Sequence, residues 1–338
     1  MRLMHPTPYP AHHPSMGPVV SVVVPTHRRP RLLERCLGAL CAQTYPASRA
    51  EVIVVEDGGH VGTPTHRLVD ALTRSAPVRV RYLAVPRRGP AAARNAGWRA
   101  ASGGIIAFTD DDALPDARWL EEGVRACEDG AEVVSGRTLV PLPARPTDAE
   151  RNVRGLERAT FVTCNAFCRR SRLEAIGGFD PRFEVAYRED SDLEFGLLES
   201  GARIVRLPQA VVVHPARAAP LFSSLGRQRN QQFDALLYRK HRRLFRAYIR
   251  RRPPVGHYLT CAALTAAAAG LLTGHRRLAS ACSLGWTVLT LHFLSRRLRG
   301  TRHAPADLVD MLVTSVLIPP SAVFWRLRGA CRFRTLFL

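Results

Sequence analysis

Lysine is almost absent from this 338-residue chain, in which Lys240 is the single lysine among 49 basic residues. Arginine dominance on this scale can follow from a GC-rich genome as well as from selection, so it is not counted as a sign of phosphate binding. Acids are scarce near the C-terminus. The segment from Arg239 onward contains 18 basic residues and only two acids, Asp307 and Asp310, so it carries a charge of +16 out of the total of +21. Such a charge suits either a nucleic-acid binder or a membrane-facing segment.

Two other absences narrow the class of protein. The eight cysteines include no CxxC pair, which argues against a zinc site and favours ordinary reduced thiols. Residues 1–18 contain five prolines and no long apolar run, so we expect a disordered leader and not a signal peptide, with catalysis on the cytoplasmic side. A hydrophobic content of 46% excludes a chain that is disordered throughout.

Strand and helix patterns alternate through the first part of the chain. Apolar, β-branched runs of the kind found in strands buried on both faces alternate with segments of helical periodicity. This alternation predicts an α/β fold with a parallel, doubly wound sheet, in which ligands bind beyond the carboxyl ends of the strands. The predicted strands are Val19–Val24, Glu51–Val55, Val78–Val85 and Ile105–Thr109, and the helices between them begin near Pro30, Thr65 and Pro90.

The pattern is less regular after Pro141. Phe161–Phe167 and Ala210–Val213 are predicted as strands, Asp190–Ser200 as a helix, and Leu225–Ile249 as a basic amphipathic helix.

Three apolar stretches dominate the C-terminal region. Pro253–Gly274 and Leu278–Ser295 carry no formal charge and are long enough, or nearly so, to cross a bilayer as a helical hairpin. Met311–Trp325 is interrupted by Pro319-Pro320, so we expect it to be re-entrant or interfacial. Arginines flank the hairpin as expected for cytoplasmic ends, although His275-Arg276-Arg277 in its turn would have to cross. A soluble helical subdomain is the alternative.

Three consecutive aspartates, Asp110, Asp111 and Asp112, follow the fourth predicted strand. Carboxylates at this density repel one another unless a cation neutralises them, and their oxygens suit Mg²⁺ or Mn²⁺. The alternative is an acidic turn at the start of the next helix. Because Asp57 follows the second strand at the same edge of the predicted sheet, the metal hypothesis is favoured.

At this point the chain resembles the family 2 glycosyltransferases, which are inverting enzymes with the Rossmann-like GT-A fold. The segments that carry the resemblance are VSVVVPTHRRPRLLERCLGAL, EVIVVEDGG, RGPAAARNAGWRAASGGIIAFTDDDALPDARWL, GGFDPRF and YREDSDLEFGLLESGARI, within residues 19–245. The resemblance implies a mostly parallel sheet flanked by helices. We therefore divide the chain into the leader 1–18, a glycosyltransferase domain 19–245, and a basic, apolar helical region 246–338 that is membrane-inserted or interfacial.

The resemblance also implies roles for the residues that would bind a nucleotide-sugar. Those residues are Pro25 and Thr26 in the first loop, Asp57 against the base, Arg94 of an ARN motif beside Asn95, and Asp110 and Asp111 of the acidic triplet.

Metal binding and catalysis are implied for the remaining motifs. Asp112 and Asp110 match the family's DxD motif and would hold the metal, with His214 as a further contact. The ED motif supplies the general base that takes the proton of the acceptor hydroxyl. Asp190 is the predicted base, Glu189 is its neighbour in the motif, and Asp192 is the second candidate.

The basic patch Arg227–Arg229 would touch either the diphosphate or anionic lipid headgroups. No QxxRW motif is evident, which favours transfer of a single sugar over polymerisation.

The predicted function is transfer of a sugar from a UDP-, GDP- or dTDP-linked donor to an acceptor glycan or glycolipid, at a cell membrane and with the catalytic domain facing the cytoplasm. The predicted cofactor is Mg²⁺ or Mn²⁺. Membrane lipids are expected partners, and nucleic acid is not. The alternatives are a non-catalytic, membrane-bound scaffold that binds nucleotide-sugars, or a basic nucleic-acid-binding protein.

Overall fold

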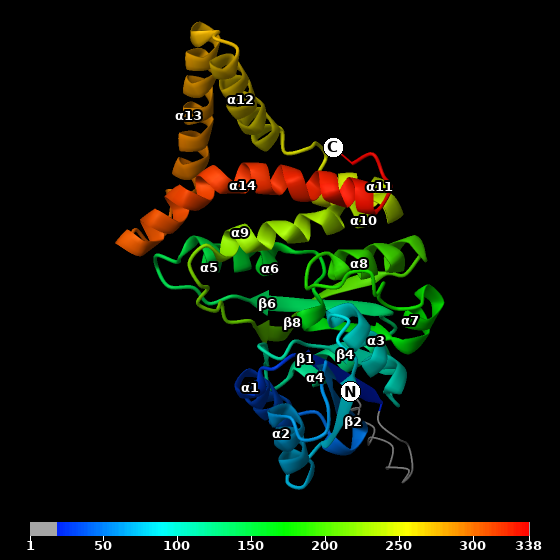
Figure 1. Cartoon of the computed structure of the whole chain (residues 1–338). Coiled ribbons are helices and arrows are strands. Elements are labelled where there is room, and N and C mark those ends of the chain that lie inside the picture. Colours follow the sequence, from blue (N-terminus) through cyan, green and yellow to red (C-terminus); the bar gives the residue numbers. More distant parts are fainter. Residues whose placement is uncertain (1–18, 338) are drawn as a thin grey trace, which may run out of the picture.

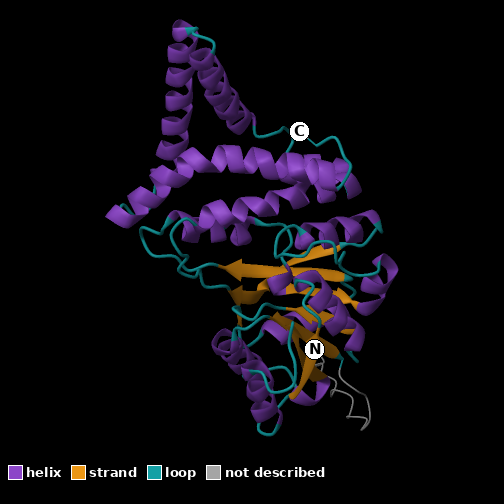
Figure 2. Ribbon diagram, in the orientation of Figure 1, coloured by secondary structure: helices purple, strands orange, loops and turns teal. Residues whose placement is uncertain are grey.

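The computed structural model describes residues 19–337, so the predicted leader, residues 1–18, lies outside the described residues. Within that part of the chain, eight strands form one mixed sheet in the order β3-β2-β1-β4-β7-β6-β8-β5 (Figures 1 and 2). The strands are β1 (Val20–Thr26), β2 (Ala50–Asp57), β3 (Arg79–Val85), β4 (Ile105–Phe108), β5 (Leu114–Pro115), β6 (Val133–Leu139), β7 (Ala166–Arg169) and β8 (Ile204–Val213).

The first four strands are parallel, as the alternating pattern predicted. Every residue of β1 and β2 is buried, which explains why these segments read as continuous apolar runs. Successive side chains point to opposite faces, so Val22 and Val24 join one apolar cluster and Val23 joins the other. The carboxyl ends of β1, β2 and β4 therefore meet at one edge of the sheet.

Helices cover both faces of the sheet. They are α1 (Pro30–Cys41), α2 (Pro64–Thr73), α3 (Pro90–Ala100), α4 (Trp119–Glu128), α5 (Asp148–Val153), α6 (Gly155–Arg158), α7 (Arg170–Ile176), α8 (Glu189–Glu199), α9 (Ser223–Arg227), α10 (Gln232–Lys240) and α11 (Arg242–Leu244). The family's fold expected from the sequence, a mostly parallel sheet flanked by helices with apolar helices after it, is thus present.

Two predicted elements have different limits. The strand predicted at Phe161–Phe167 begins only at Ala166, because a 3₁₀ turn, Thr163–Asn165, precedes β7. The helix predicted at Leu225–Ile249 is broken into short pieces, including the turns Gln228–Gln231 and Phe245–Ile249. His241 interrupts it with a non-helical backbone (φ −130°, ψ 52°), and its ring is held by Asp192 and Glu199.

The apolar stretches form three helices, α12 (Val255–Leu272), α13 (Arg276–Leu298) and α14 (Pro305–Arg332). Each of the three described helices is long and apolar enough to cross a membrane. In Figure 1, α12 and α13 project as a hairpin, whereas α14 lies across its base and along α9 and α10. The third stretch is one continuous helix despite Pro319 and Pro320, so the proline pair does not break it as a re-entrant segment would require.

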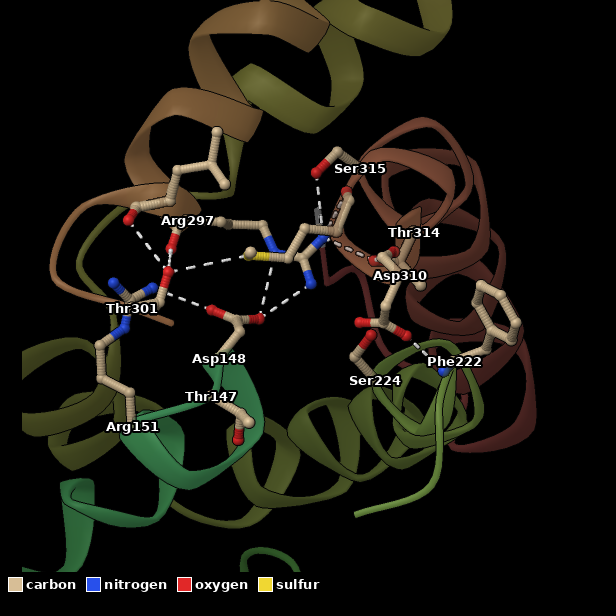
Figure 3. A network of polar contacts seen from close by, with 12 residues as sticks. Thr147, Asp148, Arg151, Phe222, Ser224, Arg297, Thr301, Asp310, Thr314 and Ser315 are labelled. Atoms are coloured by element: carbon tan, nitrogen blue, oxygen red, sulfur yellow. Dashed lines mark hydrogen bonds and ion pairs between the residues drawn. The ribbon is translucent and has the colours of Figure 1, made fainter. Parts of the chain in front are cut away.

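A buried arginine attaches the hairpin to the rest of the protein (Figure 3). Arg297, near the end of α13, donates from Nε and Nη2 to one oxygen of Asp148 in α5, at 3.1 and 2.8 Å. Its Nη1 donates to the hydroxyl oxygens of Thr314 and Ser315 in α14, at 2.7 and 2.9 Å. Because a buried charge is tolerated only when it is paired and hydrogen-bonded, this network fixes α13 and α14 against α5.

Candidate active site

A cavity of about 1170 Å³ opens at the carboxyl ends of β1, β2 and β4. This is the edge of an α/β sheet at which ligands are expected to bind. Ten of the eleven residues that the sequence nominated line the cavity; Asp192 is the eleventh and lies outside it. The ten are Pro25, Thr26, Asp57, Arg94, Asp110, Asp111, Asp112, Glu189, Asp190 and His214.

Asp57 ends β2 and binds the loop that precedes α3. Its carboxylate accepts hydrogen bonds from the backbone N–H groups of Arg88 (2.7 Å) and Gly89 (3.1 and 3.2 Å). Gly89 has φ +91°, and a Cβ atom there would lie 2.2 Å from the carbonyl oxygen of Glu184. The loop thus requires glycine at this position, and Asp57 holds the loop against the cavity.

Asp111 faces β1. Its carboxylate accepts a hydrogen bond from the Thr26 hydroxyl at 2.8 Å and lies 3.4 Å from Nη1 of Arg29. Burial, together with the charge of Asp112, raises the pKa of Asp111 to about 6, although Thr26 and Arg29 lower it in part. The carboxylate of Asp111, the middle residue of the triplet, therefore already accepts hydrogen bonds from side chains of the protein itself.

Asp110, Asp112 and His214 form a cluster suited to a divalent cation. Each offers one ligand atom, and the three atoms lie within 4.8 Å of one another. His214 directly follows β8, which pairs antiparallel with β5 so that Val213 lies opposite Leu114. Because β5 begins two residues after Asp112, this pairing places His214 beside the aspartate triplet. The Nδ1 atom of His214 is buried with no hydrogen-bond partner among the described residues. Two carboxylates and an imidazole are a donor set that fits Mn²⁺, and the carboxylates also suit Mg²⁺.

Positive side chains surround the same cluster. His214 Nε2 lies 3.3 Å from Asp112, and Arg217 Nη2 lies 3.0 Å from it. Burial alone would raise the pKa of Asp112, but the hydrogen bond from His214 and the charges of His214 and Arg217 lower it below its usual value. Asp112 is therefore held as a carboxylate, the form that binds a cation.

Arg94 joins the two acidic motifs. It projects from α3 with 3% of its surface exposed, and it donates to Asp110 at 2.8 Å and to Glu189 at 3.2 Å. Burial disfavours its charge, but the carboxylates of Asp110, Asp190 and Glu189 outweigh burial and raise its pKa. One guanidinium thus faces three acids. Because this single positive charge does not neutralise all three acids, burial and the negative charge of Asp190 raise the pKa of Glu189 to about 8.

Asp190 lies on the first turn of α8 and is held by one neighbour. Its two oxygens accept hydrogen bonds from the hydroxyl and the backbone N–H of Thr163, at 2.5 and 3.2 Å. Burial raises the pKa of Asp190, and Arg94 and Thr163 lower it only in part. Its helix begins after Arg188, whose left-handed backbone (φ 74°) turns Glu189 and Asp190 toward the cavity. A partly buried carboxylate with a raised pKa has the proton affinity that a general base needs.

Asp192 points the other way. Both of its oxygens contact Nζ of Lys240, at 2.6 and 2.8 Å, and its Oδ1 lies 3.1 Å from His241 Nε2. Asn95 of the ARN motif is likewise internal, since its amide bonds the backbone of Phe179 at both ends. These two residues hold elements together and do not face the cavity.

Several residues that line or shape the site had no signal in the sequence. Thr163 sits in a segment that reads as a strand, and Arg217 follows a strand with no motif around it. The basic patch Arg227–Arg229 is placed on α9 and the following turn, outside the cavity, whereas Arg217 contacts Asp112. Only the fold brings these positions together with the acids.

Comparisons with known proteins agree with this geometry. The sequence profile of glycosyl transferase family 2 matches residues 21–163. Glycosyltransferase AglE of Haloferax volcanii is 34% identical over 176 residues, which are 48% of this chain and 56% of that protein. The pre-mycofactocin glycosyltransferase of Mycobacterium tuberculosis is 30% identical over 224 residues, 60% of this chain and 45% of that protein. The chain thus spans about half the length of these relatives.

The fold has counterparts among solved structures. The mannosyltransferase PcManGT from Pyrobaculum calidifontis, solved in complex with GDP-Man and Mn²⁺, superposes with a TM-score of 0.54 at 22% identity. That match covers 96% of this chain and 89% of the other. Residues 1–349 of TarS of S. aureus, in complex with UDP, give a TM-score of 0.50 at 14% identity. Both likenesses concern the fold. Over residues 21–163 the chain is thus similar to glycosyl transferase family 2, and the curated relatives that it resembles are glycosyltransferases.

Proposed function

We propose that this protein is a metal-dependent, inverting glycosyltransferase that moves a sugar from a nucleoside-diphosphate donor to an acceptor hydroxyl. The observation that carries the proposal is the shared cavity. Asp190, a partly buried acid of raised pKa, and the cluster of Asp110, Asp112 and His214 line the same space of about 1170 Å³. An inverting transfer needs one base on the acceptor side and positive charge on the leaving-group side.

The chain's own residues divide this work. Asp190 would accept the proton of the acceptor hydroxyl, and Thr163 orients its carboxylate for that step. Arg94 holds Glu189 and Asp110 in place from one side of the cavity. Asp57 positions the loop at Gly89, against which the nucleotide base would lie. Glu189, whose pKa is about 8, would hold a proton at neutral pH and so limit repulsion around Asp190.

Asp110, Asp112 and His214 would hold the cation, Mg²⁺ or Mn²⁺. A bound cation would supply positive charge to a diphosphate leaving group. Arg29 and Arg217, each within 4.0 Å of Asp112, would add fixed positive charge beside it. In support, a neighbour in fold, PcManGT, was solved with GDP-Man and Mn²⁺.

The proposed acceptor is a glycan or glycolipid presented at a membrane surface, of the lipid-linked or cell-envelope kind. Its support is the apolar hairpin α12–α13, whose large exposed side chains include Leu259, Leu271, Leu284 and Leu291. We place the protein at a cell membrane with the catalytic domain on the cytoplasmic side, where nucleotide-sugars are available. α14, packed along α10, then keeps the cavity near the lipid surface.

Donor turnover tests this proposal. The full chain, purified in detergent, is incubated with UDP-, GDP- and dTDP-sugars and Mn²⁺, with and without a membrane lipid extract, and the released nucleoside diphosphate is measured. We expect one donor class to be turned over, faster with the extract and not at all with EDTA. Binding of a donor without any release, in every combination, would instead identify a non-catalytic scaffold.

The stereochemistry is tested on the product. Proton NMR of the anomeric signal distinguishes inversion from retention of the donor's configuration. We expect inversion, because Asp190, which is hydrogen-bonded to the uncharged Thr163, can serve as the single base. Among residues 19–337, every other carboxylate of the cavity is held by an arginine side chain or, for Asp57, by backbone N–H groups. A product that retains the donor configuration would refute the mechanism while leaving sugar transfer intact.

A further inference from the structure

A second cavity, of about 300 Å³, is lined by residues that precede α12 and by residues of the segment after α14. Figure 1 shows the course of these two segments, near the label of the C-terminus. It is separate from the sugar-transfer cavity, with which it shares no lining residue. Its lining is arginine and aromatic or apolar side chains: Tyr238, Arg242, Phe245, Arg246, Arg250, Arg251, Arg252, Pro253, Arg326, Leu336 and Phe337.

The charge of this lining is of one sign. Among residues 19–337, six arginines face the cavity and no acid does. For residues 19–337, no carboxylate lies within 4.0 Å of the five arginines between 242 and 252 that line the cavity. Arg246 donates to the hydroxyl of Tyr238 and stacks on its ring, which fixes its position without neutralising it. A concave group of uncompensated guanidinium ions is a site for an anion, and their forked donors match phosphate oxygens.

Arg326 provides an independent indication of a ligand. It projects from α14 with 1% of its surface exposed, and its Nε is buried without a hydrogen-bond partner among the described residues. Its one ion pair is long, 3.5 Å to Asp234, whose other oxygen already accepts hydrogen bonds from Arg188 and Tyr187. Its guanidinium lies 4.1 Å from the ring centre of Phe337, another lining residue. A buried cation with an unused donor is unfavourable unless a ligand completes its bonding.

The position of the cavity indicates the source of the anion. Arg250, Arg251 and Arg252 immediately precede α12, whose first exposed apolar side chains are Val255 and Leu259. If the hairpin enters the hydrocarbon region, these arginines lie at the depth of the headgroups, where each basic side chain gains attraction from anionic lipid. The aromatic and apolar part of the lining, Phe245 and Phe337 among it, would contact the adjoining glycerol and acyl atoms.

We propose that this cavity binds the phosphate of an anionic membrane lipid, with Arg326 at its base and Arg250 and Arg251 at its rim. The lipid would fix the hairpin and α14 at a set depth. The proposal concerns membrane binding and stands whether or not the other cavity transfers a sugar.

Binding of short-chain lipids tests it. The full chain in a nonionic detergent is titrated with dioctanoyl phosphatidylglycerol, dioctanoyl phosphatidylcholine or inorganic phosphate, and binding is followed by microscale thermophoresis. We expect saturable binding of the phosphatidylglycerol, and binding of the other two that is about tenfold weaker or absent. The double variant Arg250→Gln/Arg251→Gln and the single variant Arg326→Gln should each weaken phosphatidylglycerol binding by about tenfold.

A matched control removes two positive charges from the C-terminal end of α13, which is the other end of the hairpin. Arg296→Gln/Arg299→Gln neutralises two exposed arginines at the end of α13, outside the cavity, and should change binding less than about twofold. Equal losses in both double variants would reveal unspecific surface attraction and overturn the proposal. If inorganic phosphate binds as tightly as phosphatidylglycerol, the cavity is a site for a free anion and the proposal is overturned. If phosphatidylcholine binds as tightly as phosphatidylglycerol, the cavity is an apolar groove without preference for an anionic lipid, and the proposal is also overturned. Unchanged melting temperatures exclude misfolding of the variants, and if Arg326→Gln does not fold, the rim variant alone decides.

Discussion

Replacing Asp190 with asparagine removes the proposed base while keeping its shape. A positioned general base contributes about 10²–10⁴-fold to rate, so Asp190→Asn should lower kcat by that factor, or about 3–5 kcal/mol of transition-state stabilisation. Asparagine offers one acceptor oxygen where Asp190 offers two, so one of the two bonds from Thr163 is lost, at about 1–3 kcal/mol. Removal of the charge of a partly buried carboxylate whose pKa is raised offsets that cost.

We therefore expect a large fall in kcat with a small change in melting temperature and in donor affinity. The assay is release of nucleoside diphosphate, run beside donor binding measured by calorimetry. Asp192→Asn is the matched control, because Asp192 is the same residue type two positions along and contacts Lys240 and His241 outside the cavity. It should lower the melting temperature and leave kcat within about threefold. If Asp192→Asn abolishes turnover and Asp190→Asn does not, the assignment of the base is refuted.

Three further predictions follow from the same contacts. Asp112→Asn should weaken Mn²⁺ binding at least about tenfold with little change in fold, measured by calorimetry with the metal alone, and unaltered affinity would remove Asp112 from the metal site. Asp148→Ala leaves Arg297 buried without its acid and should reduce the free energy of unfolding by about 3 kcal/mol, seen as a lower melting temperature; an unchanged value would contradict the role of this pair. Because the pKa of Glu189 rises from 4.5 unfolded to about 8 folded, the folded state holds an extra proton in between. Wild-type stability should therefore fall relative to Glu189→Gln by up to about 1.4 kcal/mol per pH unit between pH 5 and 8, and parallel melting profiles would show that Glu189 does not titrate in this way.

The sequence was most informative about the parallel half of the sheet. Val20–Thr26 and Ala50–Asp57 are buried on both faces, so burial alone imposes apolar runs that can be recognised without neighbours. The acids that follow these strands and β4 were predicted to share one edge because parallel strands end together, and Asp57 and Asp110–Asp112 do line one cavity.

Contacts between distant segments were not accessible in this way. Asp190 and Asp192 lie two residues apart on one helix, and an acidic run gives no indication of which side chain faces the cavity. The bend at His241 depends on its pairing with Asp192 and Glu199, so local helical propensity predicted an unbroken helix. Thr163 acquires its role only from the return of the chain beside α8.

Donor binding with and without metal is the most direct test of the central claim, that Asp110, Asp112 and His214 hold a cation where a nucleotide-sugar binds. Calorimetric titration of the full chain with UDP- and GDP-sugars, in Mn²⁺ or in EDTA, measures this coupling. The account predicts that at least one donor binds in Mn²⁺, about tenfold or more tightly than in EDTA, and that Asp112→Asn removes most of the difference. A donor that binds equally well in Mn²⁺ and in EDTA, or no donor binding in either, would contradict it.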